Sequence, residues 1–208
     1  MKSAVILISG RGSNMQALVE GGTGLEFKAV LSNRPDAKGL EWARSKGIAT
    51  QAIDHKAFAD REAFDAALGD AIAAHAPDFI LYAGFMRIVG ENFVNRFHGK
   101  LVNIHPSLLP SFPGLHTHRR ALEAGVKVHG ATVHFVTATL DSGPIVIQAA
   151  VPVLANDTVE TLSKRVLAQE HIVYPRAIGW FMQGKLVIEN GRVNVRGNDA
   201  QYLYSDRP

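Results

Sequence analysis

The segment Ala4–Asn14, AVILISGRGSN, has the pattern of a buried β-strand that runs into a glycine-rich turn and the start of a helix. Ala4–Ile8 is an unbroken apolar run, and a similar run lies at Phe79–Ala83. Unbroken apolar strands are typical of parallel sheets that are covered on both faces, because neither side of such a strand meets water. The segment therefore predicts an α/β protein.

Strand and helix patterns alternate between these two runs. The predicted elements are a helix at Met15–Glu20 with Ser13 as its cap, a strand at Phe27–Ser32, a helix at Gly39–Lys46, a strand at Ile48–Ile53 and a helix at Arg61–His75 with Asp60 as its cap. This alternation predicts a Rossmann-like, doubly wound and mostly parallel sheet.

The pattern changes after residue 100. The predicted elements are a strand at Leu101–Ile104, a helix around Arg119–Ala124, antiparallel C-terminal strands at Ala131–Val136 and Ile145–Val153, a helix from Thr158 to Gln183 with Asp157 as its cap, and a hairpin of Leu186–Glu189 with Arg192–Val195. Pro175 predicts a break in the long helix, and Asn190-Gly191 predicts the hairpin turn. We expect one domain over residues 1–208, with halves at 1–100 and 101–190 and a loose tail at 197–208.

Composition excludes several classes of protein. The chain has no cysteine, which rules out disulfides and thiolate chemistry. No apolar run approaches the roughly 20 residues that span a bilayer, so we expect no membrane association. The 22 Lys and Arg are scattered among 19 acidic residues, which does not favour nucleic acid. We expect a cytoplasmic protein that acts on small molecules, as a monomer or a weak homodimer.

The glycine-rich turn is the first candidate site. Free N–H groups at the start of a helix and the positive end of its dipole attract an anion. Met15 stands where a dinucleotide fingerprint needs a third glycine, and the lysine of a P-loop is absent. A single phosphate therefore fits this turn better than a pyrophosphate does. A tight turn with no ligand is the alternative.

Asn103 and His105 form the second candidate site. If the strand is extended through His105, as Pro106 favours, both side chains point to one face at its carboxyl end. Ligands of open α/β sheets bind beyond such ends. An amide donor beside an imidazole could stabilise an oxyanion and move a proton. Alternatively, both side chains only satisfy backbone groups of the loop.

Asp141 and a set of histidines come next. Asp141 is either a turn former or, if it reaches His105, a carboxylate that favours the charged imidazole. Four further histidines lie nearby in sequence: His116, His118, His129 and His134. Their spacing matches no metal motif, so we expect no metal and assign them structural or substrate-contacting roles.

Several motifs, taken together, carry a resemblance. They are SGRGSN at Ser9–Asn14, AGFMRI at Ala83–Ile88, NIHPSLLP at Asn103–Pro110, PGLHTHRRAL at Pro113–Leu122, HGATVHFVTATLDSGPIV at His129–Val146 and QEH at Gln169–His171. In this order and spacing, the chain resembles the folate-dependent formyltransferases, and within them the phosphoribosylglycinamide formyltransferase family. NIHPSLLP with LDSGP is specific for the superfamily, while SGRGSN and QEH indicate the glycinamide ribonucleotide branch.

The resemblance implies a reaction and its residues. The formyl group of 10-formyltetrahydrofolate would pass to the amine of glycinamide ribonucleotide in de novo purine biosynthesis, without a metal. The residues that it implies for the ribonucleotide are Gly12, Ser13, Asn14 and Glu170. Those that it implies for folate are Arg61, Met86, Arg87, Ile88, Val89, Asn103, Thr137, Ala138, Thr139, Leu140 and Asp141. The first half of the chain would hold the phosphate, and the second half the folate and the catalytic residues.

The family's catalytic triad would be Asn103, His105 and Asp141. Asn103 and protonated His105 would stabilise the oxyanion of a tetrahedral intermediate, and His105 would pass a proton toward the leaving folate nitrogen. Asp141 would keep His105 charged and oriented. Three residues depart from the family pattern. Arg11 stands in place of Asn and is expected to alter the contacts with phosphate. Ala138 and Thr139 stand in place of acidic residues and are expected to alter the affinity for folate while the chemistry is retained.

Three alternatives differ in testable ways. Formyltetrahydrofolate deformylase, a hydrolase with the same catalytic loop, carries an N-terminal regulatory domain, which this sequence is not expected to have. Methionyl-tRNA formyltransferase needs a further C-terminal domain. A non-catalytic nucleotide-binding module would use the glycine-rich turn alone and would not need Asn103, His105 and Asp141.

Overall fold

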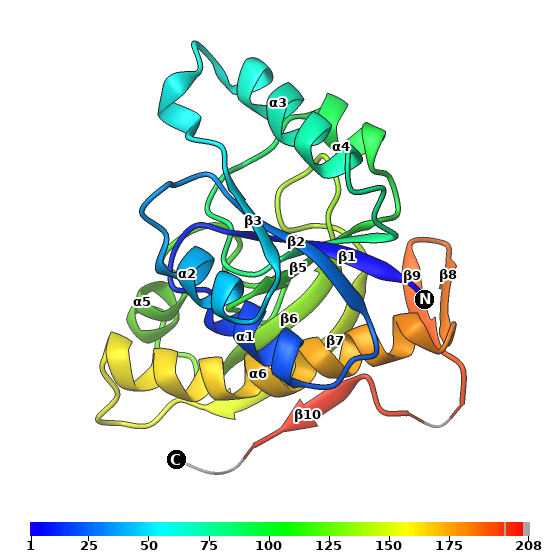
Figure 1. Ribbon diagram of the computed structural model, residues 1–208. Coiled ribbons are helices and arrows are strands. Elements are labelled where there is room, and N and C mark those ends of the chain that lie inside the picture. Colours follow the sequence, from blue (N-terminus) through cyan, green and yellow to red (C-terminus); the bar gives the residue numbers. More distant parts are fainter. Residues whose placement is uncertain (198, 206–208) are drawn as a thin grey trace. The chain divides into compact units, whose positions relative to one another are not determined.

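The computed structural model describes residues 1–197 and 199–205 (Figure 1). The chain forms two compact units, the first being Met1–Asn103 with Val136–Ala138 and the second Ile104–Phe135 with the chain from Thr139 onward. The organisation as a single domain with halves at 1–100 and 101–190 stays a prediction.

The first unit is a parallel sheet in the order β5-β4-β1-β2-β3. Its elements are β1 (Ser3–Ile8), α1 (Ser13–Glu20), β2 (Glu26–Ser32), α2 (Lys38–Ser45), β3 (Ala49–Ala52), the 3₁₀ turn η1 (His55–Ala57), α3 (Arg61–Ala73), β4 (Phe79–Tyr82), α4 (Glu91–Arg96) and β5 (Leu101–His105). The last two residues of β5 belong to the second unit. The predicted alternation of strands and helices is confirmed.

Both faces of this sheet are covered, as the unbroken apolar strands predict. Val5 and Leu7 of β1 share a buried cluster with Phe64 of α3. On the opposite face, the side chain of Ile8 lies against Gly39 of α2, so closely that a Cβ at Gly39 would overlap it. The helices α3 and α4 accordingly lie on one side of the strands and α1 and α2 on the other (Figure 1). Each fully buried large apolar side chain contributes about 1.5–3 kcal/mol to folding.

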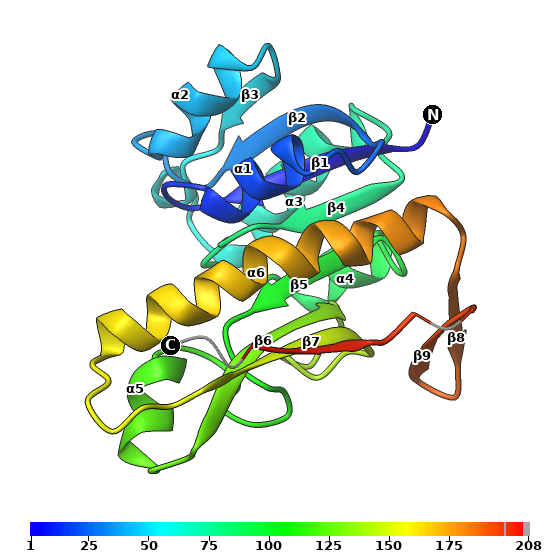
Figure 2. The ribbon, with the colours of Figure 1, turned by 90° about the horizontal axis from the view of Figure 1, so that it is seen from below.

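The second unit contains the strands β10-β7-β6 in that order. Its elements are α5 (Thr117–Glu123), β6 (Val128–Phe135), β7 (Ile145–Pro152), α6 (Val159–Met182), the separate hairpin β8 (Leu186–Glu189) with β9 (Arg192–Val195), and β10 (Tyr202–Tyr204). β6 and β7 are antiparallel, as predicted, and α6 packs against both. Figure 2 shows β10 beside β7. No helix in the described ranges is long and apolar enough to cross a bilayer.

The helix caps differ in part from prediction. Asp60 caps α3 as predicted, because its carboxylate accepts the N–H of Ala63 at 2.8 Å. Ser13 does not cap α1. Gly12 takes that position in the left-handed conformation, with φ of 71°, which glycine adopts without strain.

The long helix also departs from prediction at its N-terminal cap and at Pro175. Thr158 caps α6 through a capping box with Thr161, while Asp157 instead binds Arg165. The predicted break at Pro175 is wrong, since α6 continues to Met182. A proline inside a helix costs about 3 kcal/mol or more, and buried side chains on either side, such as Tyr174, offset that cost.

The C-terminal tail is not loose where the structure describes it. Tyr202–Tyr204 form β10, which pairs in parallel with Gln148–Ala150 of β7. Residue 198 and residues 206–208 lie outside the described part of the chain. A three-residue strand shows no periodicity of its own, so only its pairing partner reveals it.

Candidate active site

The strand β5 ends on His105, one residue beyond the predicted Leu101–Ile104, so the condition that the strand is extended through His105 is met. Asn103 and His105 are two residues apart on this strand, so their side chains leave it on the same side. Asn103 is half-buried and His105 is buried. The backbone then enters the proline-rich loop that begins at Pro106.

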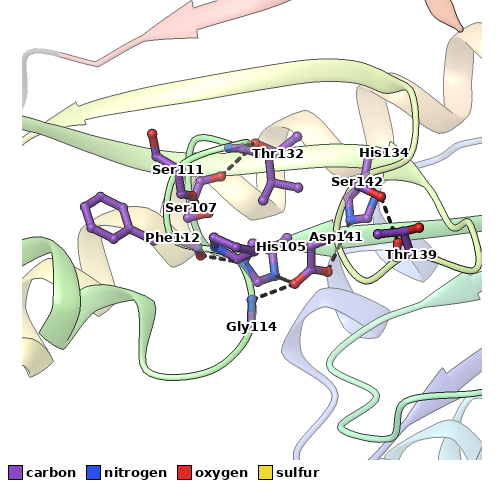
Figure 3. A network of polar contacts seen from close by, with 12 residues as sticks. His105, Ser107, Ser111, Phe112, Gly114, Thr132, His134, Thr139, Asp141 and Ser142 are labelled. Atoms are coloured by element: carbon purple, nitrogen blue, oxygen red, sulfur yellow. Dashed lines mark hydrogen bonds and ion pairs between the residues drawn. The ribbon is translucent and has the colours of Figure 1, made fainter.

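Both ring nitrogens of His105 face hydrogen-bond acceptors (Figure 3). Nε2 lies 3.1 Å from the carbonyl oxygen of Phe112, and Nδ1 lies 3.5 Å from Oδ2 of Asp141. A neutral imidazole has one N–H and can satisfy only one of them, whereas an imidazolium has two. The arrangement therefore suits a protonated His105.

Asp141 occupies a special turn between β6 and β7. Its φ of 48° is left-handed, and its side chain is only 7% exposed. Oδ2 accepts the backbone N–H of Gly114 at 2.8 Å, which directs the carboxylate toward His105. The contact between His105 and Asp141, which the sequence pattern left open, is thus present in the second unit.

His134 lies on the other side of the same carboxylate. Its Nε2 is 3.9 Å from Oδ1 of Asp141, and its Nδ1 lies 2.8 Å from the carbonyl oxygen of Phe135. Burial lowers the pKa of His134, an effect that the Phe135 carbonyl and Asp141 oppose in part. Of the two histidines beside Asp141, His105 lies nearer to the carboxylate, at 3.5 Å against 3.9 Å for His134.

His118 and His129 form an edge-to-face pair in the same unit. Their rings are 5.3 Å apart and nearly perpendicular. Burial lowers the pKa of His129 to about 4 and also lowers the pKa of His118. His116 is exposed and precedes α5 in a left-handed conformation. Within the described ranges, no group of three or more His, Asp or Glu side chains could hold a metal ion.

Two polar residues that the sequence analysis did not single out fasten the proline-rich loop. Thr132 of β6 donates its hydroxyl to the carbonyl oxygen of Ser107 at 2.7 Å and accepts the N–H of Leu109 at 3.1 Å. Gln148 of β7 donates to the carbonyl oxygen of Leu109 at 2.8 Å. Each is a polar residue between apolar neighbours in its strand, and that interruption of the apolar pattern is the signal that could have identified them.

The glycine-rich turn leads into the N-terminus of α1. Ser13 and Asn14 are the first residues of the helix, and N–H groups in its first turn have no acceptor within the helix. A Cβ at Gly10 would meet nothing within 4 Å, so the turn is open there. A hydrogen bond of 3.0 Å from the N–H of Gly39 to the carbonyl oxygen of Gly10 holds the turn against α2.

The other predicted binding residues fall in both units. Arg61 begins α3, and within the segment after β4 Met86 and Ile88 are exposed while Val89 is buried. Thr137 and Ala138 belong to the first unit; Thr139, Leu140 and Asp141 belong to the second. Glu170 is buried on α6 of the second unit. Its predicted proximity to the glycine-rich turn stays a prediction.

The sequence model of the family described as formyl transferase matches residues 1–178. The chain belongs to the formyl transferase family. It is 52% identical over 203 residues to the phosphoribosylglycinamide formyltransferase of Escherichia coli strain K12, covering 96% of this chain and 94% of that protein. The resemblance seen in the motifs is therefore confirmed.

Solved structures of related enzymes have the same fold as this formyl transferase. Glycinamide ribonucleotide transformylase 1 from Symbiobacterium toebii matches with a TM-score of 0.91 and 50% identity over 94% of each chain. Phosphoribosylglycinamide formyltransferase from Anaplasma phagocytophilum matches with a TM-score of 0.92 and 41% identity over 99% of each chain. The predicted fold class, a mostly parallel α/β sheet with antiparallel C-terminal strands, is confirmed.

Proposed function

We propose that the chain transfers the formyl group of 10-formyltetrahydrofolate to the amine of glycinamide ribonucleotide. The products are formylglycinamide ribonucleotide and tetrahydrofolate, in de novo purine biosynthesis. The observation that carries the proposal is His105, held between the Phe112 carbonyl and the Asp141 carboxylate. The names of the E. coli and A. phagocytophilum relatives support the choice of substrates.

The proposed chemistry is an acyl transfer through a tetrahedral intermediate. The substrate amine attacks the formyl carbon, a new C–N bond forms, and the former carbonyl oxygen becomes an oxyanion. The Asn103 amide and the N–H groups of His105 are donors suited to that oxyanion. The amine loses a proton, the folate nitrogen gains one as its bond to carbon breaks, and His105 carries it. The formyl group arrives activated on the folate, so the step needs no metal.

The Phe112 carbonyl gives His105 a resting partner for this chemistry. In the structure Nε2 of His105 lies 3.1 Å from that carbonyl oxygen. An oxyanion is a stronger acceptor than a neutral carbonyl, because charge-assisted hydrogen bonds are roughly twice as strong as neutral ones. A developing oxyanion would therefore compete for the same N–H group. Asp141 stays in place behind the ring and balances its charge.

The proposed substrate contacts follow from the same residues. The N–H groups of Gly12, Ser13 and Asn14 hold the ribonucleotide phosphate at the start of α1, and Glu170 holds the glycinamide end. Folate occupies the site formed by Arg61, Met86–Val89 and the loop from Thr137 to Asp141, with Asn103 at the reacting end. Arg11 and Ala138-Thr139 alter affinity for the phosphate and folate, respectively. The enzyme works in the cytoplasm as a monomer or weak homodimer, which light scattering of the purified protein tests.

One assay tests the proposed function. We expect purified protein to consume 10-formyltetrahydrofolate, followed by absorbance, only when glycinamide ribonucleotide is present. Equal turnover without the ribonucleotide would show a deformylase-type hydrolase instead. Absence of turnover under both conditions, together with ribonucleotide binding in calorimetry, would show a non-catalytic binding module.

A further inference from the structure

The segment Met86–Gly90 has no regular secondary structure, although it follows the central strand β4 and precedes α4. Phe85 and Val89 are buried, whereas Met86 is 69% and Ile88 is 58% exposed. The described loop hydrogen bonds between backbone groups include none to Arg87 or Ile88. The segment therefore offers free backbone to a ligand, and something other than a helix or strand must fix its shape.

A serine holds the beginning of the segment. Ser9, at the end of β1, is 6% exposed, and its Oγ accepts the N–H of Met86 at 2.8 Å. The same hydroxyl donates its proton to Oδ1 of Asn33. A hydroxyl has one proton, so giving it to Asn33 leaves its lone pairs available for Met86.

Asn33, the partner of Ser9, also lies beside His55. Nδ1 of His55 is 2.9 Å from the backbone carbonyl oxygen of Asn33, which accepts its proton, and 3.2 Å from Nδ2 of the same residue. Asn33 is 2% exposed and Ser9 is 6% exposed, so the hydrogen bond between them is closed to solvent. The anchor of Met86 is therefore backed by a buried polar pair.

An aspartate holds the end of the segment. Oδ2 of Asp65 on α3 accepts the N–H of Gly90 at 2.6 Å. Asp65 is buried, and its Oδ1 has no hydrogen-bond partner in the described ranges. Burial raises the pKa of Asp65, and the hydrogen bond from the Gly90 N–H, followed by the charges of Arg61 and Arg87, opposes that effect in part. A buried carboxylate with an unsatisfied oxygen is costly, so packing alone does not account for an aspartate here.

These anchors connect the segment to the other proposed binding residues of the first unit. Ser9 is the first residue of the glycine-rich turn, Ser9–Asn14. Asp65 lies four residues after Arg61 on α3, which places the two side chains on one face of the helix. Loss of the hydrogen bond from Met86 to Ser9 would free the start of the segment relative to the glycine-rich turn. Loss of the hydrogen bond from Gly90 to Asp65 would free its end relative to Arg61.

We propose that Ser9 and Asp65 are positioning residues, which fix the two ends of Met86–Gly90 and so hold in one shape the backbone that binds folate. This inference rests on the proposed function, because that function places folate on this segment. Ser9 and Asp65 act through backbone N–H groups and do not touch the reacting atoms.

Amide hydrogen exchange tests the anchors without any substrate. We expect Ser9→Ala to accelerate exchange at Met86, and Asp65→Ala to accelerate it at Gly90, by about tenfold or more, since each loses the acceptor of that N–H. Leu7 in β1 should exchange as in the parent protein. Asp65→Asn keeps an acceptor and should restore slow exchange. Unchanged exchange at Met86 and Gly90 in the alanine variants would overturn the proposal.

Steady-state kinetics tests what the anchors do for catalysis. We expect Asp65→Ala to raise KM for 10-formyltetrahydrofolate about tenfold or more while KM for the ribonucleotide stays within about twofold. Asp65→Asn should recover most of the loss. Asp70→Asn, an exposed aspartate on the same helix, is the matched control and should change neither KM. Equal changes in both KM values would show a merely structural role and refute the inference.

The two readouts separate this inference from the proposed function. If the parent protein transferred no formyl group, the proposed function would fail, while hydrogen exchange would still decide whether Ser9 and Asp65 hold the segment. If transfer occurred and exchange accelerated, but KM for folate did not change, the segment would be anchored for another purpose. That result would overturn the assignment to folate and leave the transfer reaction intact.

Discussion

Oδ2 of Asp141 lies 3.5 Å from Nδ1 of His105, and the same oxygen accepts the N–H of Gly114 at 2.8 Å. One carboxylate oxygen therefore joins the end of β5, the loop that follows it and the turn between β6 and β7 (Figure 3). The side chains of His105 and Asp141 are 8% and 7% exposed, so water screens their interaction little. This pair is the basis of the first two predictions.

Replacing His105 by alanine should lower turnover by at least about 100-fold, because a positioned acid–base group is lost. The rate of formyl transfer with both substrates present measures this. His98→Ala is the matched control, since His98 is exposed in the first unit, and its rate should equal that of the parent. A near-normal rate for His105→Ala would remove His105 from the mechanism.

Asp141→Asn should lower kcat by about 10-fold or more while leaving the fold unchanged. Asparagine tolerates the left-handed φ of 48° and can still accept the Gly114 N–H, but it has no charge to offer His105. The measurement is kcat together with the circular dichroism spectrum. A variant with parental kcat would show that the Asp141 charge is not used in the reaction.

Asp157 should contribute to stability through its contacts at the start of α6. Its carboxylate accepts two hydrogen bonds from Arg165 and one from the N–H of Leu154, and the side chain is 2% exposed. Asp157→Asn should lower the free energy of unfolding at pH 7 by about 1–3 kcal/mol. Denaturant titration measures this change. Asp36→Asn, which removes an exposed ion pair with Arg34, should cause no measurable change.

The same aspartate predicts an acid dependence. The hydrogen bonds from Arg165 are the main reason that the pKa of Asp157 is lowered from 3.8 to about 2. Its stabilising effect is therefore present above the ordinary pKa and is lost as pH falls through about 2. The difference in unfolding free energy between the parent and Asp157→Asn should shrink on acidification. A difference that stays constant from pH 5 to pH 2 would contradict the lowered pKa.

His129 predicts a loss of stability at milder acidity. Burial lowers its pKa from 6.5 to about 4, so between these values the unfolded chain binds a proton that the folded chain does not. Stability therefore falls as pH decreases through this range. In His129→Gln, the loss between pH 7.5 and pH 5 should be smaller by about 1–2 kcal/mol. His98→Gln should show the parental loss, and an unchanged loss in His129→Gln would exclude the lowered pKa.

The sequence predicted those features of the fold whose pattern lies within a few neighbouring residues. The apolar runs of β1 and β4 predicted buried parallel strands, Asp60 predicted its helix start, and Asn190-Gly191 predicted the β8–β9 hairpin. Three elements were missed because they are short: α4 is six residues long, and η1 and β10 are three residues each. The break predicted at Pro175 was wrong because packing of the buried side chains around it outweighs the free-energy cost of a proline inside a helix.

In the candidate site, too, local patterns predicted some residues and missed others. Strand alternation and the position of Pro106 were enough to place Asn103 and His105 on one side of a strand end. Thr132 and Gln148 interrupt apolar stretches, which marks them as unusual, but the sequence does not reveal the distant loop that each of them fastens. The role of Asp141 came from resemblance rather than from its spacing.

The sequence by itself determined the family, the order of strands and helices, and the residue types available for acyl transfer, because motifs and periodicities are local. Only the tertiary structure decided which of these residues meet: Asp141 with His105, Ser9 with Met86, and Asp65 with Gly90. Each pair joins segments far apart in the chain, and packing of whole elements, which no local pattern encodes, brings them within hydrogen-bonding or ion-pair distance.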